Sequence, residues 1–93
     1  MIPHELKRKS SVLFVCTANV CRSPLAAELF RHLIRRMNGT CEIWRIESAG
    51  IWATPGLPAA KEVQAVLWEL GIDISDHRSR VVSKNILKDF ALF

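Results

Sequence analysis

The sequence predicts an α/β fold, a parallel sheet with flanking helices that is incomplete at the C-terminal end. Short apolar runs typical of buried strands alternate along the chain with stretches of helical periodicity. Such alternation is typical of parallel sheets, whose strands are joined by right-handed crossovers. The 93 residues suit one small domain, residues 1–93, and the chain stops within a predicted third strand.

The first strand is predicted at Ser11–Val15, where a short β-rich apolar run occurs. A helix is predicted from Ser23 onward, with Pro24 in its first turn and a stop signal at Asn38 and Gly39. Apolar residues recur along it at the spacing of one helix face. These residues are Ala26, Leu29, Phe30, Leu33, Ile34 and Met37.

The rest of the chain continues the alternation. Residues 41–50 are predicted to form the second strand, and residues 51–58 a loop because they contain two prolines and a glycine. Helical spacing of apolar residues predicts a helix over Ala59–Leu70, with Gly71 as its stop. The remaining predicted elements are a connection over 72–82, a short helix capped by Ser83 that runs through Lys88, and the start of a third strand at 90–93.

Composition narrows the class of protein. With 49% apolar and 24% charged residues, the chain is typical of a globular protein. No apolar run approaches the roughly 20 residues that span a bilayer. The basic N-terminal segment, 1–10, is expected to be flexible and lacks a signal-peptide pattern, so we expect a cytoplasmic protein without a membrane partner. The net charge of +4 is dispersed and no DNA-binding motif accompanies it, so no nucleic-acid partner is expected.

The three cysteines argue against a disulfide framework and against a metal site. An odd number of cysteines without secretory features disfavours structural disulfides. Cys16 and Cys21 would need two further ligands to hold zinc, and no histidine or cysteine lies at zinc-ligand spacing from them. We therefore predict no metal, and we interpret Cys41, Trp44 and Trp68 as packing residues.

The loop CTANVCR, residues 16–22, connects the first strand to the first helix. Ligands of open α/β sheets bind at the carboxyl ends of strands, where loop N–H groups and a helix N-terminus attract an anion. Arg22 can bind two phosphate oxygens, and the same positive field lowers the pKa of a thiol at Cys16. A thiolate beneath a phosphate is a nucleophile toward phosphorus. Two half-buried cysteines of an ordinary core are the alternative, because one Cys-x5-Arg spacing is weak evidence by itself.

Three stretches carry a resemblance to a known family: VLFVCTANVCRSPLAAELF (12–30), ESAGIWATPGLPA (47–59) and GIDISDHRSR (71–80). They are similar to the low-molecular-weight protein tyrosine phosphatases, and the likeness covers nearly all of the chain after residue 10. The resemblance implies a Rossmann-like fold of the phosphotyrosine phosphatase I kind and no cofactor. It also implies hydrolysis of phosphotyrosine in proteins, or of small aryl phosphates, through a phosphocysteine on Cys16.

The resemblance also implies roles for individual residues. Cys16 would be the nucleophile, Arg22 would bind the phosphate and its transition state, and Ser23 would donate a hydrogen bond to the Cys16 thiolate. Asn19 would hold a strained loop backbone, and Cys21 would form a reversible disulfide with Cys16. The residues expected to bind the phosphate oxyanion are Thr17, Ala18, Asn19, Val20, Cys21 and Arg22.

Further residues have both a functional and a plainer interpretation. Trp52 is expected to line the entrance where an aromatic substrate lies, with an ordinary surface-loop aromatic as the alternative. Asp76, His77 and Arg78 match the family pattern and are expected to form a structural hydrogen-bonding cluster. Ala18 stands where many family members carry glycine, a mild departure that would stiffen the loop.

One catalytic residue of the family has no counterpart. The family's general acid is an aspartate in an Asp-Pro pair near the end of a longer chain, and no Asp-Pro occurs here. Loss of the acid would cost about 10²–10⁴-fold in leaving-group protonation, so impaired turnover is expected. The sequence is compatible with a natural end at Phe93 and with a truncation. A stub of a third strand would leave Val12–Val15 poorly covered, so we expect a homodimer through this exposed sheet edge.

Two other functions stay open at this point. A catalytically weakened oxyanion-binding module, or a redox sensor that uses Cys16 and Cys21, is favoured by the missing acid. Arsenate reductases share this loop, but they relay a disulfide through downstream cysteines. This sequence has none after Cys41, which disfavours that reading.

Overall fold

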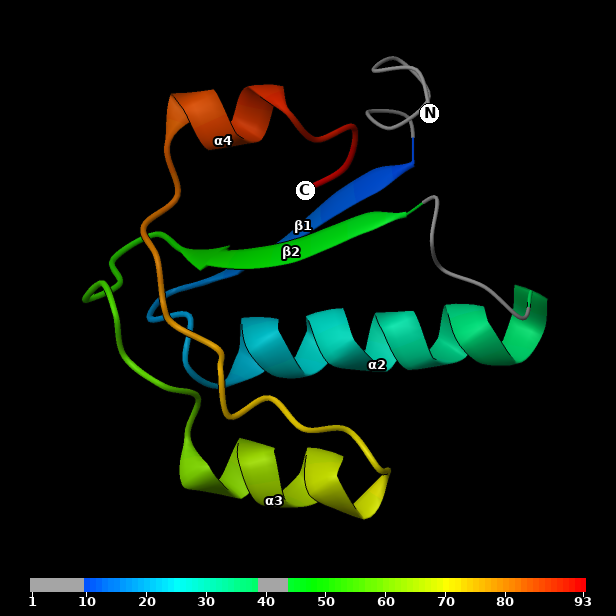
Figure 1. Cartoon of the computed structure of the whole chain (residues 1–93). Helices are drawn as coiled ribbons and strands as arrows, with labels where there is room; N and C mark the ends of the chain where they lie inside the picture. Colours follow the sequence, from blue (N-terminus) through cyan, green and yellow to red (C-terminus); the bar gives the residue numbers. More distant parts are fainter. Residues whose placement is uncertain (1–9, 39–43) are drawn as a thin grey trace.

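The computed structural model describes residues 10–38 and 44–93. The elements are β1 (Ser11–Cys16), α2 (Arg22–Asn38), β2 (Arg45–Gly50), α3 (Lys61–Glu69) and α4 (Lys84–Lys88). The two strands form a sheet with α4 on one face and α2 on the other, and α3 lies beyond α2 (Figure 1). This is the α/β fold with flanking helices that the sequence predicts.

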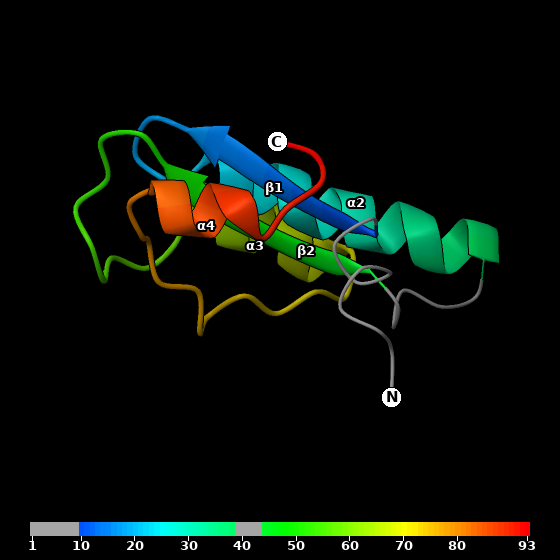
Figure 2. The same cartoon turned by 90° about the horizontal axis from the view of Figure 1, so that it is seen from above.

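The two strands pair in parallel, from Ser11 opposite Arg45 to Cys16 opposite Gly50. β1 includes Cys16, one residue beyond the predicted strand. Residues 41–43 of the predicted second strand lie outside the described residues. Figure 2 shows the carboxyl ends of both strands on the same side of the molecule, where the connections to α2 and α3 begin. The parallel register thus brings two loops together at one edge of the sheet.

The predicted third strand is present as a single parallel bridge between Val12 and Leu92. The N–H of Leu13 donates to the carbonyl of Leu92 at 2.9 Å, so Leu92 lies on the side of β1 away from β2. Parallel ladders alternate their bonds between two neighbours, so the N–H and C=O of Val15 face the same side as those of Leu13. No described residue pairs with them there.

The helix ends follow from local backbone chemistry. α3 starts at Lys61 and not at Ala59, because Ala60 keeps an extended backbone with φ −56° and ψ 143°. Gly71 adopts φ +78°, the left-handed conformation that often follows a helix end. Ser83 caps α4 as predicted, because its hydroxyl accepts a hydrogen bond from the N–H of Ile86 at 3.2 Å. The other predictions that lie outside the described residues concern the N-terminal segment up to residue 9, Gly39 and Cys41.

Both faces of the sheet are buried, as a parallel sheet requires. The cluster between the sheet and α2 contains Val12, Ala27, Ile34 and Ile46, with Phe14, Phe30 and Trp44 packed against it. The cluster on the opposite face contains Leu13, Ala49 and Phe90. Successive residues of β1 therefore point to opposite faces. The Trp44 ring lies edge-on to Phe30 with centroids 5.6 Å apart, which confirms Trp44 as a packing residue.

The predicted apolar helix faces are only partly buried. On α2, Ile34 is buried but Leu33 and Met37 are exposed. The interpretation of Trp68 as a packing residue is wrong, since its side chain is 68% exposed. Leu67 is fully buried, and the next residue on a helix points about 100° away from it. Within 10–38 and 44–93, no helix has the length and apolar content that crossing a membrane requires.

Candidate active site

The loop that joins β1 to α2 is held against the segment that follows β2. The N–H of Ile51 donates to the carbonyl of Cys16 at 2.8 Å, and the N–H of Trp52 donates to the carbonyl of Thr17 at 2.9 Å. A Cβ atom on Gly50 would lie 2.6 Å from the carbonyl oxygen of Thr17 and 3.0 Å from the backbone nitrogen of Asn19. Only glycine therefore allows this close approach, which places the loop at the carboxyl end of the sheet.

Asn19 is the buried centre of the loop. Its backbone has φ +58°, and it is the non-glycine residue with positive φ in the described chain. The Asn19 side-chain amide donates to the hydroxyl of Ser23 at 2.8 Å and to the hydroxyl of Ser48 at 2.9 Å. Asparagine tolerates this conformation better than most residues, and its side chain ties the loop to α2 and β2 at once.

The segment after α3 completes the bonding of Asn19. The backbone carbonyl of Asn19 accepts a hydrogen bond from Nε2 of His77 at 2.8 Å. The side-chain oxygen of Asn19 accepts from the backbone N–H of Arg80 at 2.9 Å. Because a carbonyl oxygen can only accept, Nε2 of His77 carries its proton. His77 and Arg80 thus hold the loop in place through their hydrogen bonds to Asn19.

The Cys16 thiol lies within reach of several donors. Sγ of Cys16 is 3.0 Å from the hydroxyl of Ser23 and 3.3 Å from the backbone nitrogen of Asn19. The Asn19 amide already donates to the Ser23 oxygen, so the Ser23 proton is free to point at Cys16; the alternative acceptor, the carbonyl of Ala49, is 3.5 Å away. Ser23 is therefore positioned to donate to Cys16, and its role at a thiolate stays a prediction.

The balance of these contacts favours the thiolate. Partial burial raises the pKa of Cys16, but hydrogen bonds from the Ser23 hydroxyl and from the N–H groups of Ser23, Asn19 and Ala18 outweigh it. The pKa of the Cys16 thiol is therefore lowered from its ordinary value. A thiolate at the end of a buried strand and beside a helix N-terminus is an activated nucleophile.

An open cavity of about 270 Å³ surrounds this thiol. Its lining residues are Phe14, Val15, Cys16, Thr17, Arg22, Ser23, Ala26 and Ile51. Arg22, the first residue of α2, is exposed there. The structure thus brings Cys16, Arg22 and Ser23 together around one space. That this space binds an oxyanion stays a prediction.

Apart from Thr17, the remaining predicted site residues do not line this cavity, although the N–H of Ala18 hydrogen-bonds the Cys16 thiol. Trp52 is 85% exposed and does not line this cavity, although its backbone bonds to Thr17. Val20 is half-buried, while Ala18 and Cys21 are exposed. Cys16 and Cys21 are both free thiols in this structure. The substrate role of Trp52 and the redox pairing of the two cysteines stay predictions.

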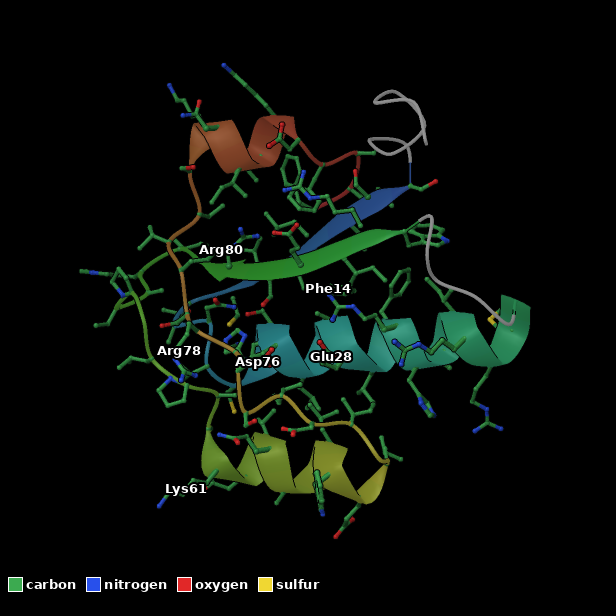
Figure 3. The ribbon with its side chains drawn as sticks, in the orientation of Figure 1. Phe14, Glu28, Lys61, Asp76, Arg78 and Arg80 are labelled. Atoms are coloured by element: carbon green, nitrogen blue, oxygen red, sulfur yellow. The ribbon has the colours of Figure 1, made fainter. Side chains whose placement is uncertain are left out.

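The cluster predicted at residues 76–78 is partly present. His77 binds the loop, and Arg78 donates to the carbonyls of Ser75 and His77 at 3.1 and 2.7 Å. Asp76 and Arg78 line a second cavity of about 260 Å³, together with Glu28 of α2 and Arg80; Figure 3 labels these residues. His77 and Arg78 therefore serve the structural role expected of them.

Sequence reasoning overlooked three residues at this site: Ser48, Gly50 and Arg80. Ser48 and Arg80 bond to Asn19, and Gly50 allows the loop to approach. All three lie inside the stretches that resemble the family, and that resemblance was the signal that could have identified them. Among the described residues, no group of histidine, cysteine and carboxylate side chains is arranged to hold a metal ion.

Fold and site together define an α/β protein with a cysteine-centred loop at the carboxyl end of a parallel sheet. This chain belongs to the low molecular weight phosphotyrosine protein phosphatase family, whose model matches residues 11–93. A solved relative, the low molecular weight protein tyrosine phosphatase from T. tengcongensis, superposes with a TM-score of 0.79 at 41% identity. The match covers 91% of this chain and 57% of that one.

Curated relatives carry different activities in their names. The human low molecular weight phosphotyrosine protein phosphatase is 41% identical over 87 residues, 89% of this chain and 50% of that protein. An arsenate reductase of Staphylococcus aureus is 36% identical over 81 residues, 87% of this chain and 55% of that protein. A protein-arginine-phosphatase of Geobacillus stearothermophilus is 40% identical over 73 residues, 78% of this chain and 45% of that protein. The chain thus spans about half the length of these relatives.

Proposed function

We propose that this chain carries out phosphoryl transfer from phosphotyrosine, or from another aryl phosphate, to Cys16. The observation that carries the proposal is the Cys16 thiol itself, whose pKa is lowered by hydrogen bonds from Ser23 and from loop N–H groups. A thiolate at neutral pH is the form that attacks phosphorus. The family to which the chain belongs supports the same reaction class.

The proposed reaction has two steps. Sγ of Cys16 attacks phosphorus, so that an S–P bond forms while the bond from phosphorus to the aryl oxygen breaks and its electron pair leaves on that oxygen. Water then attacks phosphorus, the S–P bond breaks, and Cys16 regains its thiolate as inorganic phosphate departs. Arg22 and the loop N–H groups would hold the phosphate oxygens in both steps.

The proton for the leaving group limits the proposed reaction. No carboxyl group lines the Cys16 cavity among the described residues. An activated aryl alcohol leaves as its anion without this proton, whereas tyrosine needs it more. We therefore expect the first step to proceed for activated aryl phosphates and the second step to be slow.

An aromatic phosphate is the preferred substrate in this proposal. Apolar residues that line the cavity, among them Phe14, Val15 and Ile51, favour a flat aromatic group over a sugar phosphate, and a phosphotyrosine protein is the corresponding partner. The names of two relatives mention arginine phosphate and arsenate chemistry. Within residues 1–93 no cysteine follows Cys41, so this stretch does not itself supply the downstream cysteine that a disulfide relay needs.

The test is a rapid-mixing experiment with 4-nitrophenyl phosphate at mildly acidic pH, beside the Cys16→Ser variant. We expect a burst of nitrophenol near one equivalent that requires Cys16, followed by slow turnover. Absence of a burst would overturn the proposal. A second candidate, an oxyanion-binding module without turnover, would then be identified by retained binding of phosphate or vanadate; this candidate is favoured by the lack of a carboxyl group among the described residues that line the Cys16 cavity.

A further inference from the structure

We propose that Arg80, held in place by Glu47, is a positioning residue for the Cys16 thiolate. Arg80 does not touch the thiol and acts on it through Asn19. This inference deepens the proposed function because it concerns the same nucleophile. Its test reads the ionisation of the thiol and not turnover, so the two proposals can fail independently.

The backbone of Arg80 joins the loop to the end of β2. Its N–H donates to the side-chain oxygen of Asn19 at 2.9 Å, and its carbonyl accepts from the N–H of Gly50 at 2.9 Å. The loop packs closely against Gly50, where a Cβ atom would lie 2.6 Å from the carbonyl oxygen of Thr17. A shift of the Arg80 backbone would therefore disturb both Asn19 and the strand end that supports the loop.

The Arg80 side chain fixes that backbone. Its Nε donates to the carbonyl of Ser48 at 3.0 Å and its Nη2 donates to a carboxylate oxygen of Glu47 at 2.5 Å. Figure 3 shows Arg80 near the carboxyl end of β2. The guanidinium uses two donors of its rigid fork for two different acceptors, a geometry that a lysine ammonium does not reproduce.

Glu47 is itself held from the opposite side. Its second carboxylate oxygen accepts from Nε of Arg45 at 2.6 Å. Burial raises the pKa of Glu47, but the hydrogen bond from Arg45 and the charge and hydrogen bond of Arg80 outweigh it, so the pKa is lowered and the carboxylate stays ionised. Glu47 is thus a fixed anion that orients the Arg80 guanidinium.

The path from Arg80 to the thiol is short. Asn19 passes the constraint on in two ways, because its backbone N–H lies 3.3 Å from Sγ of Cys16 and its amide donates to the Ser23 hydroxyl. The Ser23 hydroxyl is in turn 3.0 Å from Sγ. Both of these contacts contribute to the lowered pKa of Cys16. Loosening Asn19 removes stabilisation from the thiolate and raises that pKa.

A simple charge effect makes the opposite prediction for Glu47. If only the long-range field mattered, removing the negative charge of Glu47 would lower the pKa of Cys16. If Glu47 positions Arg80, removing its carboxylate raises the pKa of Cys16, because Asn19 is no longer held. The sign of the change therefore separates positioning from the field.

The experiment measures the rate at which iodoacetamide alkylates Cys16 as a function of pH, read on the Cys16 peptide by mass spectrometry. The variants are Arg80→Lys and Glu47→Ala, with Arg78→Gln as the matched control, because Arg78 lies two residues away and bonds only backbone carbonyls of its own segment. Because residues of one hydrogen-bond network couple measurably, we expect Arg80→Lys and Glu47→Ala to slow alkylation below the thiol pKa by about threefold to tenfold. Arg78→Gln is expected to leave the rate within about twofold, since an exposed charge is screened.

Two further readouts keep the result clear. Glu47→Gln retains an oxygen that can accept from Arg80 and should restore most of the wild-type rate, which a field effect would not require. Faster alkylation in Glu47→Ala, or equal effects of Arg80→Lys and Arg78→Gln, would overturn the inference. A wild-type Cys16 with an ordinary thiol pKa would overturn it too. A wild-type Cys16 with a lowered pKa but no nitrophenol burst would sink the proposed function and leave this inference standing.

Discussion

The carboxyl end of the sheet and the open side of β1 differ in how completely their polar groups are paired. At the carboxyl end, the fully buried Asn19 uses its backbone N–H, its carbonyl and both side-chain polar atoms in hydrogen bonds. On the side of β1 that faces away from β2, the strand pairs with the described residues through one bridge, between Val12 and Leu92. Leu92 and Phe93 there are 62% and 71% exposed. We call the second region the open flank of β1.

Because of this difference, the hydrogen bonds around the Cys16 nucleophile do not depend on the open flank. The groups that orient Cys16 come from the loop, β2 and residues 77–80, all within the described chain. The open flank contributes none of them. The environment of the thiolate is therefore expected to survive changes on the flank, and changes at the loop are expected to cost the most.

The largest effect is expected from Asn19→Ala. The substitution leaves the Ser48 hydroxyl and the N–H of Arg80 without the partner that Asn19 provides, so we expect the free energy of unfolding to fall by about 3 kcal/mol. Urea denaturation measures the change. Asn19→Gly is the matched control, because it loses the same bonds but relieves the strain of φ +58°; we expect it to be about 1 kcal/mol more stable than Asn19→Ala. A loss below about 1 kcal/mol in Asn19→Ala would contradict the comparison.

A smaller but related effect is expected from Gly50→Ala. The new methyl would lie 2.6 Å from the Thr17 carbonyl, so the loop must move, at a cost of about 2 kcal/mol in the free energy of unfolding. The alkylation rate of Cys16 should fall with it. Gly56→Ala is the control, since its methyl meets nothing within 4 Å and costs only the strain of φ +85°, roughly 1 kcal/mol. An equal loss of unfolding free energy in Gly50→Ala and Gly56→Ala would show that the loop does not pack tightly against Gly50.

The open flank is tested by its oligomeric state. We propose that two copies of the chain pair through it, because the N–H and C=O of Val15 have no described partner there and Leu92 is exposed. Sedimentation velocity is expected to show a dimer whose dissociation constant rises about tenfold in Leu92→Lys, since a charged edge disfavours pairing. Leu33→Lys, on the exposed side of α2, adds the same charge away from the flank and should change nothing. A wild-type monomer at all concentrations would refute the pairing.

The smallest expected effect is a pH dependence of the free energy of unfolding that arises from the Cys16 thiol in the loop. Because the pKa of Cys16 is lowered in the folded chain, the unfolded chain binds more protons between that pKa and the ordinary thiol value. The free energy of unfolding should therefore rise with pH across this window and lose this contribution as pH falls through the folded pKa. Thermal unfolding of wild type and Cys16→Ser from pH 5 to 9 measures the difference. A parallel pH profile of the two proteins would argue against a stabilised thiolate.

Much of the fold follows from local patterns in the chain. The apolar run at Ser11–Val15 and the helical spacing after Pro24 predicted β1 and α2, and the Ser83 cap predicted α4. Trp68 was misjudged because its large apolar side chain was taken to pack, although it points about 100° around the helix from the buried Leu67. The burial of a helix residue depends on neighbouring elements, which periodicity does not contain.

The sequence by itself determined the order of the loop groups, because Cys16, Asn19, Arg22 and Ser23 are neighbours between one strand and one helix, and their spacing follows from the chain. Only the tertiary structure decided what holds Asn19 in place. Ser48, His77 and Arg80 reach it across separations of 29, 58 and 61 residues. Such long-range hydrogen bonds leave no periodic trace, since they depend on the parallel register that brings β2 and the 77–80 segment to the same end of the sheet.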